Sequence, residues 1–207
     1  GGIYLDTDVE IIKSFDNLLK SEAFIGFENT GTEELFVNCG QGFGSIPKNP
    51  LVKEMRDFYD NMHFCEKDGT LNMLPSPHFT TKVLCDNGLV RNNSTQKLND
   101  IVVYNSEVLC PKNITTGDII ITKDPYSIHH FTASWLDEKI KAIMEHERNI
   151  YKKYGEKIGR YILIMESILE KYTIGELFIK LPIVVLKKIV GFIQEKIYLL
   201  MDYINLY

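Results

Sequence analysis

The chain has 207 residues, of which 44% are hydrophobic and 25% are charged, and its formal net charge is −5. These values are ordinary for a globular protein and exclude wholesale disorder. Residues 1–138 hold 11 lysines and arginines against 20 aspartates and glutamates, whereas residues 139–207 hold 12 against 8. The acidic first part argues against nucleic acid as the main partner, and the basic, apolar remainder favours contact with an anionic surface.

The opening segment, residues 1–10, reads GGIYLDTDVE. Its apolar run at residues 3–5 suits a buried strand, and Asp6 and Asp8 follow that strand directly. At the carboxyl end of a strand the backbone turns into a loop, so the two carboxylates can converge on one ion. Hard divalent cations prefer such oxygen ligands and keep positions open for substrate phosphates. The opening segment therefore predicts a site for a metal ion and a diphosphate.

The next stretch predicts short elements separated by turns. Residues 9–19 have the apolar spacing of a short helix or an irregular crossover, and residues 23–28 and 35–37 are predicted strands. The glycine-rich residues 38–44 lack the spacing of a dinucleotide fingerprint or a P-loop, so they do not indicate a phosphate cradle. Either they form a flexible loop, or their glycines let the backbone approach a ligand closely.

Two helices are predicted from their first residues, Asn49-Pro50 and Ser76-Pro77, because each pair combines a capping side chain with a proline in the first turn. The polar, asparagine-rich residues 86–100 predict a surface loop. Residues 101–104 and 118–121 are further predicted strands, since both are short runs of β-branched side chains.

A second distinctive segment, residues 126–135, reads YSIHHFTASW. Adjacent residues of a strand point to opposite faces, so at most one of His129 and His130 is expected to face a site. Ser134 has the spacing of a capping box with Asp137, which gives Ser134 a structural role at the start of a helix. The same segment contains the sole tryptophan, which either lines a pocket or packs in a core.

Long helices are predicted after this segment, over residues 135–154, with an end at Gly155, and over residues 157–172. Residues 183–203 form an amphipathic pattern whose interrupting charges argue against a membrane-spanning helix. That helix either docks against the preceding domain or a second subunit, or lies in a membrane interface. In the second case four lysines would lie near anionic headgroups: Lys180, Lys187, Lys188 and Lys196.

The opening segment closely resembles the DXD signature of the glycosyltransferases of family 32, which include bacterial capsule and lipopolysaccharide transferases and fungal α-mannosyltransferases. Residues 126–135 resemble the H-H-x-x-G-S-W segment of that family, with Ala133 in place of the usual glycine. The resemblance implies an α/β fold of the Rossmann-like GT-A type. Residues 1–135 would be the C-terminal portion of its catalytic domain, lacking an N-terminal nucleotide-binding part, and residues 136–207 a helical region that contacts a membrane or a subunit.

The resemblance also implies a metal-dependent enzyme that moves a hexosyl unit from a nucleotide-diphosphate sugar to a hydroxyl group, with retention of configuration. The cofactor would be Mn²⁺ or Mg²⁺, held by Asp6, Asp8 and a histidine. Position relative to the following aromatic residue favours His130 as that ligand, with His129 as the alternative. Asp6 and Asp8 would also bind the donor, together with three further residues: Asn38, Ser134 and Trp135.

The implied acceptor is a polysaccharide, lipopolysaccharide or capsule glycan. Because such acceptors are often lipid-linked, we prefer peripheral membrane contact through residues 174–207. The protein would then be cytoplasmic, on the inner face of a bacterial membrane, or would lie in the Golgi lumen if it is eukaryotic.

Two alternatives stay open. Asp6-Thr7-Asp8-Val9 also fits the D-x-D-x-[TV] pattern of HAD-like phosphohydrolases, which form an aspartyl phosphate. That class needs a later acidic motif, and Gly117-Asp118 with Asp124 has too long a spacing for it. The second alternative is a non-catalytic, truncated remnant of a glycosyltransferase.

Overall fold

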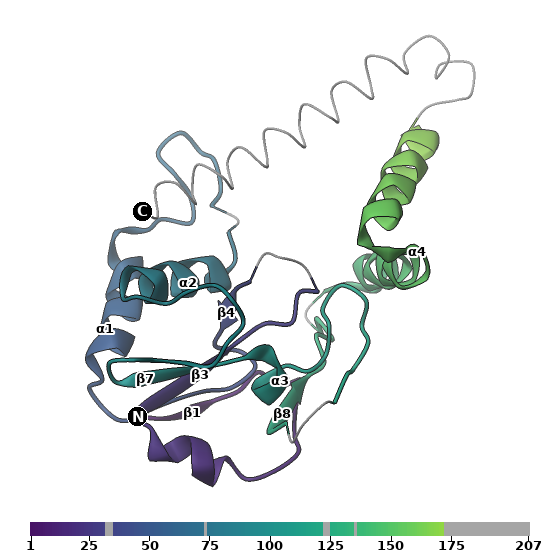
Figure 1. The fold of residues 1–207 in the computed structure, drawn as a ribbon. Coiled ribbons are helices and arrows are strands. Elements are labelled where there is room, and N and C mark those ends of the chain that lie inside the picture. Colours follow the sequence, from purple (N-terminus) through teal and green to yellow (C-terminus); the bar gives the residue numbers. More distant parts are fainter. Residues whose placement is uncertain (32–34, 73, 122–124, 135, 172–207) are drawn as a thin grey trace. The chain divides into compact units, whose positions relative to one another are not determined.

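The computed structural model describes residues 1–31, 35–72, 74–121, 125–134 and 136–171. The chain divides into two compact units, Gly1–Ser134 and Trp135–Tyr207. The first unit is an α/β fold with a mixed sheet and helices (Figure 1). The described part of the second unit is the helix α4 (Glu138–Lys171) and the residues that lead into it.

The main sheet has six strands in the order β1-β5-β3-β7-β6, with β4 paired to β3. β3 runs parallel to β7, and every other neighbouring pair in this sheet is antiparallel. These strands are β1 (Gly2–Tyr4), β3 (Ala23–Phe27), β4 (Val37–Asn38), β5 (Phe43–Ser45), β6 (Gln96–Leu98) and β7 (Ile101–Tyr104). A separate antiparallel ladder joins β2 (Val9–Ile11) to β8 (Ser127–His129).

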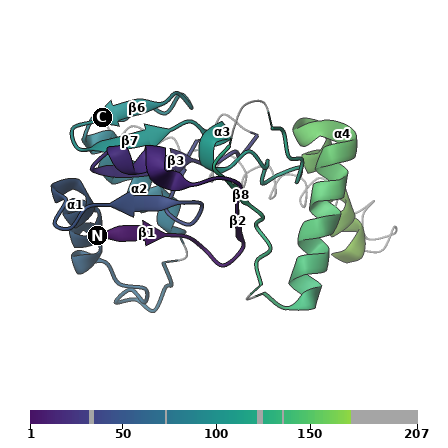
Figure 2. The ribbon, with the colours of Figure 1, turned by 90° about the horizontal axis from the view of Figure 1, so that it is seen from below.

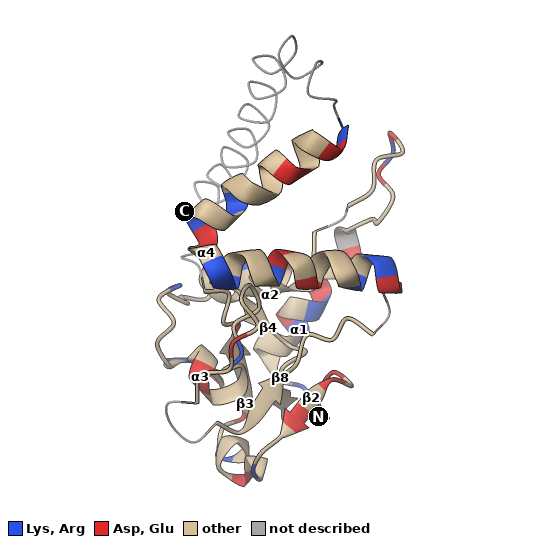
Figure 3. Ribbon diagram, turned by 90° about the vertical axis from the view of Figure 1, so that its right-hand side faces the viewer, with Lys and Arg blue, Asp and Glu red and all other residues tan. Residues whose placement is uncertain are grey.

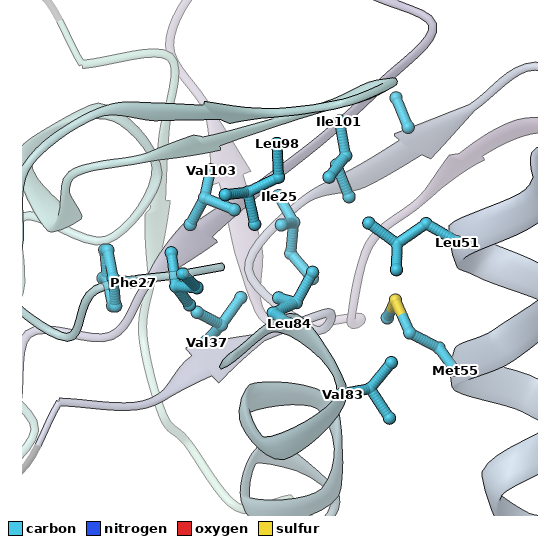
Figure 4. Packing of buried hydrophobic residues seen from close by; sticks show 12 residues of the cluster. Ile25, Phe27, Val37, Leu51, Met55, Val83, Leu84, Leu98, Ile101 and Val103 are labelled. Atoms are coloured by element: carbon cyan, nitrogen blue, oxygen red, sulfur yellow. The ribbon is translucent and has the colours of Figure 1, made fainter. Parts of the chain in front are cut away.

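Helices cover both faces of the central strand β3, and all five of its residues are buried. Ala23, Ile25 and Phe27 share one face and pack with side chains of α1 and α2. Figure 4 shows Ile25 and Phe27 in this cluster. Phe24 lies on the other face, in a cluster with residues of η1 and α3. The helices of this unit are η1 (Phe15–Lys20), α1 (Pro50–Asp57), η2 (Phe58–Asn61), α2 (Ser76–Asp86) and α3 (Ser106–Leu109).

Several elements form where the sequence predicts them. The strands over residues 23–28 and 101–104 are confirmed as β3 and β7. The helix after Asn49 is confirmed as α1, and the Asn49 Oδ1 accepts the backbone N–H of Val52 at 3.1 Å. This cap acts within three residues, which is why the local sequence is enough to predict it.

The first strand departs from the prediction. β1 is exposed along its whole length, with Ile3 at 42% and Tyr4 at 55% exposure. Among the described strands it lies at the edge of the sheet and pairs with β5 alone, in the antiparallel sense. The prediction of a buried strand is therefore wrong, because apolar side chains alone do not distinguish an edge strand from a central one.

Two further predictions are wrong: among the described residues one predicted strand is absent, and a strand lies where a loop is predicted. Residues 118–121 are not a strand, and only an isolated bridge joins Ile119 to Lys112. The strand β6 lies within the predicted loop 86–100, where it pairs with β7 and forms one edge of the sheet. Its sequence, QKL, is polar because an edge strand faces solvent, so periodicity gave no strand signal.

The second unit has the predicted break at Gly155, where a positive φ of 75° interrupts α4. His146 Nε2 lies 2.7 Å from Glu166 Oε2, although 20 residues would span about 30 Å in a continuous helix. The two halves of α4 therefore fold back on each other at Gly155. Charged residues occur along both halves, whereas the strands of the main sheet are nearly free of them (Figure 3).

The start of α4 corrects one prediction. The helix begins at Glu138, and Asp137 Oδ1 accepts the N–H of Ile140 at 2.9 Å, so Asp137 is the capping residue rather than Ser134. Trp135, the predicted amphipathic helix over residues 183–203 and the rest of the predicted contact region 174–207 lie outside the described residues. Within the described ranges, no helix has the length and apolar character needed to cross a bilayer.

Candidate metal centre

Three side chains from opposite ends of the first unit meet at one point. Asp6 and Asp8 lie in the turn between β1 and β2, and His129 is the last residue of β8. The β2-β8 ladder pairs Val9 with His129 and so brings the two segments together; Figure 2 labels β2 and β8 side by side. One ligand atom from each of the three residues lies within 4.8 Å of the other two.

Asp8 is held by the segment that follows β8. Its Oδ2 accepts the backbone N–H of Thr132 at 2.8 Å and the Thr132 hydroxyl at 3.1 Å, while its Oδ1 lies 3.1 Å from His129 Nε2. Burial by itself would raise the pKa of this carboxyl, but the hydrogen bonds from Thr132 and the nearby imidazole outweigh burial and lower the pKa. Asp8 is therefore ionised near neutral pH.

Asp6 is held by the opposite side of the site. The Tyr4 hydroxyl donates to Asp6 Oδ1 at 2.7 Å, and this bond to an acidic partner raises the pKa of the phenol. The backbone N–H of Asp6 donates to the Gly40 carbonyl at 2.8 Å. Asp6 Oδ2 lies 3.7 Å from His129 Nε2, and a Cβ at residue 40 would overlap this oxygen. The absence of a side chain at Gly40 therefore leaves room for the Asp6 carboxylate.

His129 is 5% exposed, and its ring packs against Phe131 with the ring centres 4.1 Å apart. Burial lowers the pKa of this imidazole, more than the attraction of Asp8 and Asp6 raises it. The ring is then neutral near pH 7, as a metal ligand must be. Its Nδ1 is buried and has no hydrogen-bond partner in the part of the chain that the structure describes.

The arrangement suits a divalent cation. Metal–ligand distances of about 2.0–2.2 Å place neighbouring ligand atoms about 3 Å apart, close to the 3.1 and 3.7 Å that separate His129 Nε2 from Asp8 and Asp6. In each aspartate one oxygen accepts hydrogen bonds from the protein and the other faces His129. Such outer hydrogen bonds orient metal ligands, so Asp6, Asp8 and His129 could hold a metal ion.

The preference for His130 as the metal ligand is corrected by this geometry. His130 Nε2 lies 2.9 Å from Glu10 Oε2, and the His130 carbonyl accepts from the Lys112 ammonium at 2.6 Å. The alternation of the ladder starts at Val9, whereas Asp8 still belongs to the preceding turn, where its side chain is free to reach the face of His129. The alternative, His129, is the histidine that lies with the aspartates.

Asn38 is not among the three clustered side chains and is linked to Asp6 through Gly40. Its Oδ1 accepts the N–H of Gly40 at 2.7 Å, and its Nδ2 donates to Glu28 Oε1 at 2.6 Å. Both ends of the amide are therefore engaged within the protein. Ser134 lies in a turn after the site segment, and the third residue expected to contact the donor, Trp135, lies outside the described ranges.

Three residues that support the site were not predicted: Tyr4, Gly40 and Thr132. Tyr4 lies two residues before Asp6, which is a local signal that strand alternation could have supplied. Gly40 and Thr132 act through pairings distant in sequence, so their roles have no local signal.

Comparisons of the chain with protein-family models, with curated proteins and with solved structures found no match. What the centre can bind therefore follows from its chemistry. Two carboxylates and one neutral imidazole supply mixed oxygen and nitrogen ligands, and three protein ligands leave coordination positions for water or a substrate.

Proposed function

We propose that this chain is a metal-dependent glycosyltransferase of the GT-A type, which moves a hexosyl unit from a nucleotide-diphosphate sugar to a hydroxyl acceptor. The observation that carries the proposal is the grouping of Asp6, Asp8 and His129. The two segments that resemble signature motifs of glycosyltransferase family 32 are distant in sequence, and each contributes ligands to this one group. Their meeting supports a shared role.

In the proposed reaction, breaking the anomeric bond places negative charge on the departing diphosphate. A cation bound by Asp8 and His129 would stabilise that charge as a Lewis acid. Asp6, whose side chain is 38% exposed, would bind the cation directly or through water and the donor ribose. The imidazole ligand favours Mn²⁺ over Mg²⁺, because Mg²⁺ is more strictly an oxygen-binding ion.

The proposed acceptor is a hydroxyl of a polysaccharide, lipopolysaccharide or capsule glycan, and we propose retention of the anomeric configuration. A lipid-linked acceptor would place the enzyme on the cytoplasmic face of a membrane, with residues 174–207 as the proposed contact. Deletion of these residues should then release the protein from membranes, which a sedimentation assay with vesicles would measure.

The test begins with calorimetric titration of Mn²⁺ onto the purified chain. Release of nucleoside diphosphate from UDP- and GDP-hexoses is then measured, with and without candidate acceptors. Asp8→Ala should abolish both Mn²⁺ binding and turnover. The matched control is Glu10→Ala, which removes a nearby carboxylate that pairs with His130 and lies outside the metal group. Turnover that survives Asp8→Ala or a chelator would refute the proposal.

The same assays separate the alternatives. A phosphohydrolase would release phosphate from a simple phosphoester and would not turn over a sugar nucleotide. Asp118, part of the best match to its second acidic motif, is not among the three clustered metal-binding side chains. A non-catalytic remnant would bind Mn²⁺ without any turnover.

A further inference from the structure

Glu28 is a buried acid directly after β3, with 8% of its surface exposed. Burial raises the pKa of its carboxyl, and the hydrogen bond from Asn38 only partly offsets this effect. Burying a carboxyl group is costly, and a glutamine would offer the same acceptor oxygen without the charge. The surroundings of Glu28 therefore call for an explanation beyond packing.

A continuous series of short hydrogen bonds leads from Glu28 to the metal centre. Glu28 Oε1 accepts from Asn38 Nδ2 at 2.6 Å, and Asn38 Oδ1 accepts the Gly40 N–H at 2.7 Å. The Gly40 carbonyl in turn accepts the Asp6 N–H at 2.8 Å. Gly40 also lies directly against Asp6 Oδ2, so the position of residue 40 sets the position of that oxygen.

The carboxyl group of Glu28 determines which way the Asn38 amide faces. Its Oε1 accepts a hydrogen bond, so it selects the rotamer in which the Asn38 NH₂ group points to Glu28. The Asn38 oxygen is then turned to the Gly40 N–H. In the opposite orientation two acceptors would face each other at Glu28 and two donors would face each other at Gly40.

We propose that Glu28 is a positioning residue of the metal centre, which acts through Asn38 and Gly40 to hold Asp6 Oδ2 toward His129. The identity of the bound ion rests on the proposed function, whereas the positioning of the loop does not. Glu28 touches neither the ion nor the substrate in this role. Its effect is confined to the Asp6 side of the centre.

The test compares Glu28→Met, which keeps the volume but removes the acceptor, with Glu28→Gln, which keeps an acceptor oxygen. Amide hydrogen exchange is measured on the chain without added metal, followed by Mn²⁺ titration. Glu28→Met should speed exchange of the Gly40 and Asp6 amides by about tenfold, as expected for one lost hydrogen bond. Its Mn²⁺ dissociation constant should rise by up to about 10-fold, the lower end of the cost of losing a direct partner of a ligand, because Glu28 acts through Asn38 and Gly40. In Glu28→Gln, the exchange rates and the Mn²⁺ dissociation constant should both stay close to those of the wild type.

Val83→Ala is the control for general loss of stability, because Val83 is buried in α2 and has no part in this series of hydrogen bonds. Equal exchange of the Gly40 and Asp6 amides in Glu28→Met and in Val83→Ala would overturn the proposal. Absence of Mn²⁺ binding in the wild-type chain would refute the metal function alone. The exchange data would still decide the role of Glu28.

Discussion

The two aspartates of the metal centre are held by different kinds of structure. Asp8 is 17% exposed and is fixed by two donors of Thr132 beside the β2-β8 ladder. Asp6 is 38% exposed and is fixed by one phenol and by a loop that contains Gly40. His129 belongs to the ladder and Asp8 is tied to the segment that follows it, whereas Asp6 depends on a loop. A ladder opens less readily than a loop does, so we expect Asp6 to be displaced more easily than Asp8.

The largest effect is expected from the two neighbouring histidines, because only one of them faces both aspartates. His129→Ala should weaken Mn²⁺ binding by at least about 100-fold, since a direct ligand is lost. His130→Ala should change it by less than about twofold, because His130 pairs with the exposed Glu10 instead. Calorimetric titration measures both constants. A larger loss from His130→Ala would reverse the assignment.

Gly40→Ala tests the Asp6 side by itself. The added Cβ would overlap Asp6 Oδ2 and displace that oxygen from His129. The Mn²⁺ dissociation constant should rise about 10-fold to 100-fold, as for other changes that misalign a ligand. Ser45→Ala, in the neighbouring strand β5, is the control and should bind as the wild type does. Unchanged affinity in Gly40→Ala would show that Asp6 is not a ligand.

Thr132→Val tests the Asp8 side. It removes the hydroxyl donor at 3.1 Å and leaves the backbone donor at 2.8 Å, so Mn²⁺ affinity should fall about tenfold. The pKa of Asp8 should rise toward its usual value, because one bond to the ionised form is lost. When the pH is lowered, the variant should therefore lose Mn²⁺ binding at a higher pH than the wild type does. Thr132→Ser, which keeps the hydroxyl, should show neither change.

Glu28→Gln should change how stability depends on pH. Burial in the folded state raises the pKa of Glu28 above the value of 4.5 expected in the unfolded chain. Between the unfolded-state pKa and the folded-state pKa, the folded chain therefore binds more protons than the unfolded chain. Wild-type stability is therefore lost as the pH rises through this interval. Burial raises the pKa of the neighbouring Cys110 thiol to about 12, so this thiol stays neutral throughout. Urea unfolding should show a gain for Glu28→Gln that is absent near pH 4 and grows with pH to a plateau.

The smallest effect is expected at Ala133, which has a left-handed backbone with φ of 46°. This conformation costs an alanine about 1–2 kcal/mol, while glycine adds about 0.4–1 kcal/mol of unfolded-state entropy. Ala133→Gly should therefore raise the free energy of unfolding by about 0.5–1 kcal/mol. Chemical denaturation measures it, and Ala133→Val should lower the same quantity.

Local signals were sufficient for part of this fold and of its site. The cap at Asn49 acts over three residues, and the apolar strands β3 and β7 are buried on both faces or nearly so. Each could be predicted because the physical cause lies within the segment. The two aspartates of the opening segment were likewise recognisable from their spacing after an apolar run.

The remaining features depend on pairings between distant residues. Alternation predicts that His129 and His130 face opposite sides, but the register of β8 with β2 and the turn at Asp8 decide which side is which. Asn38 is predicted to bind the donor, and the structure shows that its amide also bonds to Glu28 and Gly40. Neither partner could be assigned without the folded chain.

Asp8 and His129 are 121 residues apart, so nearly the whole first unit lies between the two sides of the metal centre. During synthesis the aspartates leave the ribosome long before the histidine does, and no nascent intermediate short of residue 129 has the complete centre. A cation bound to the complete centre would cross-link the segment that carries the aspartates to the segment that carries His129. Well above its dissociation constant, such a cation would stabilise the unit in proportion to the logarithm of its concentration, so the stability of the unit would report metal occupancy.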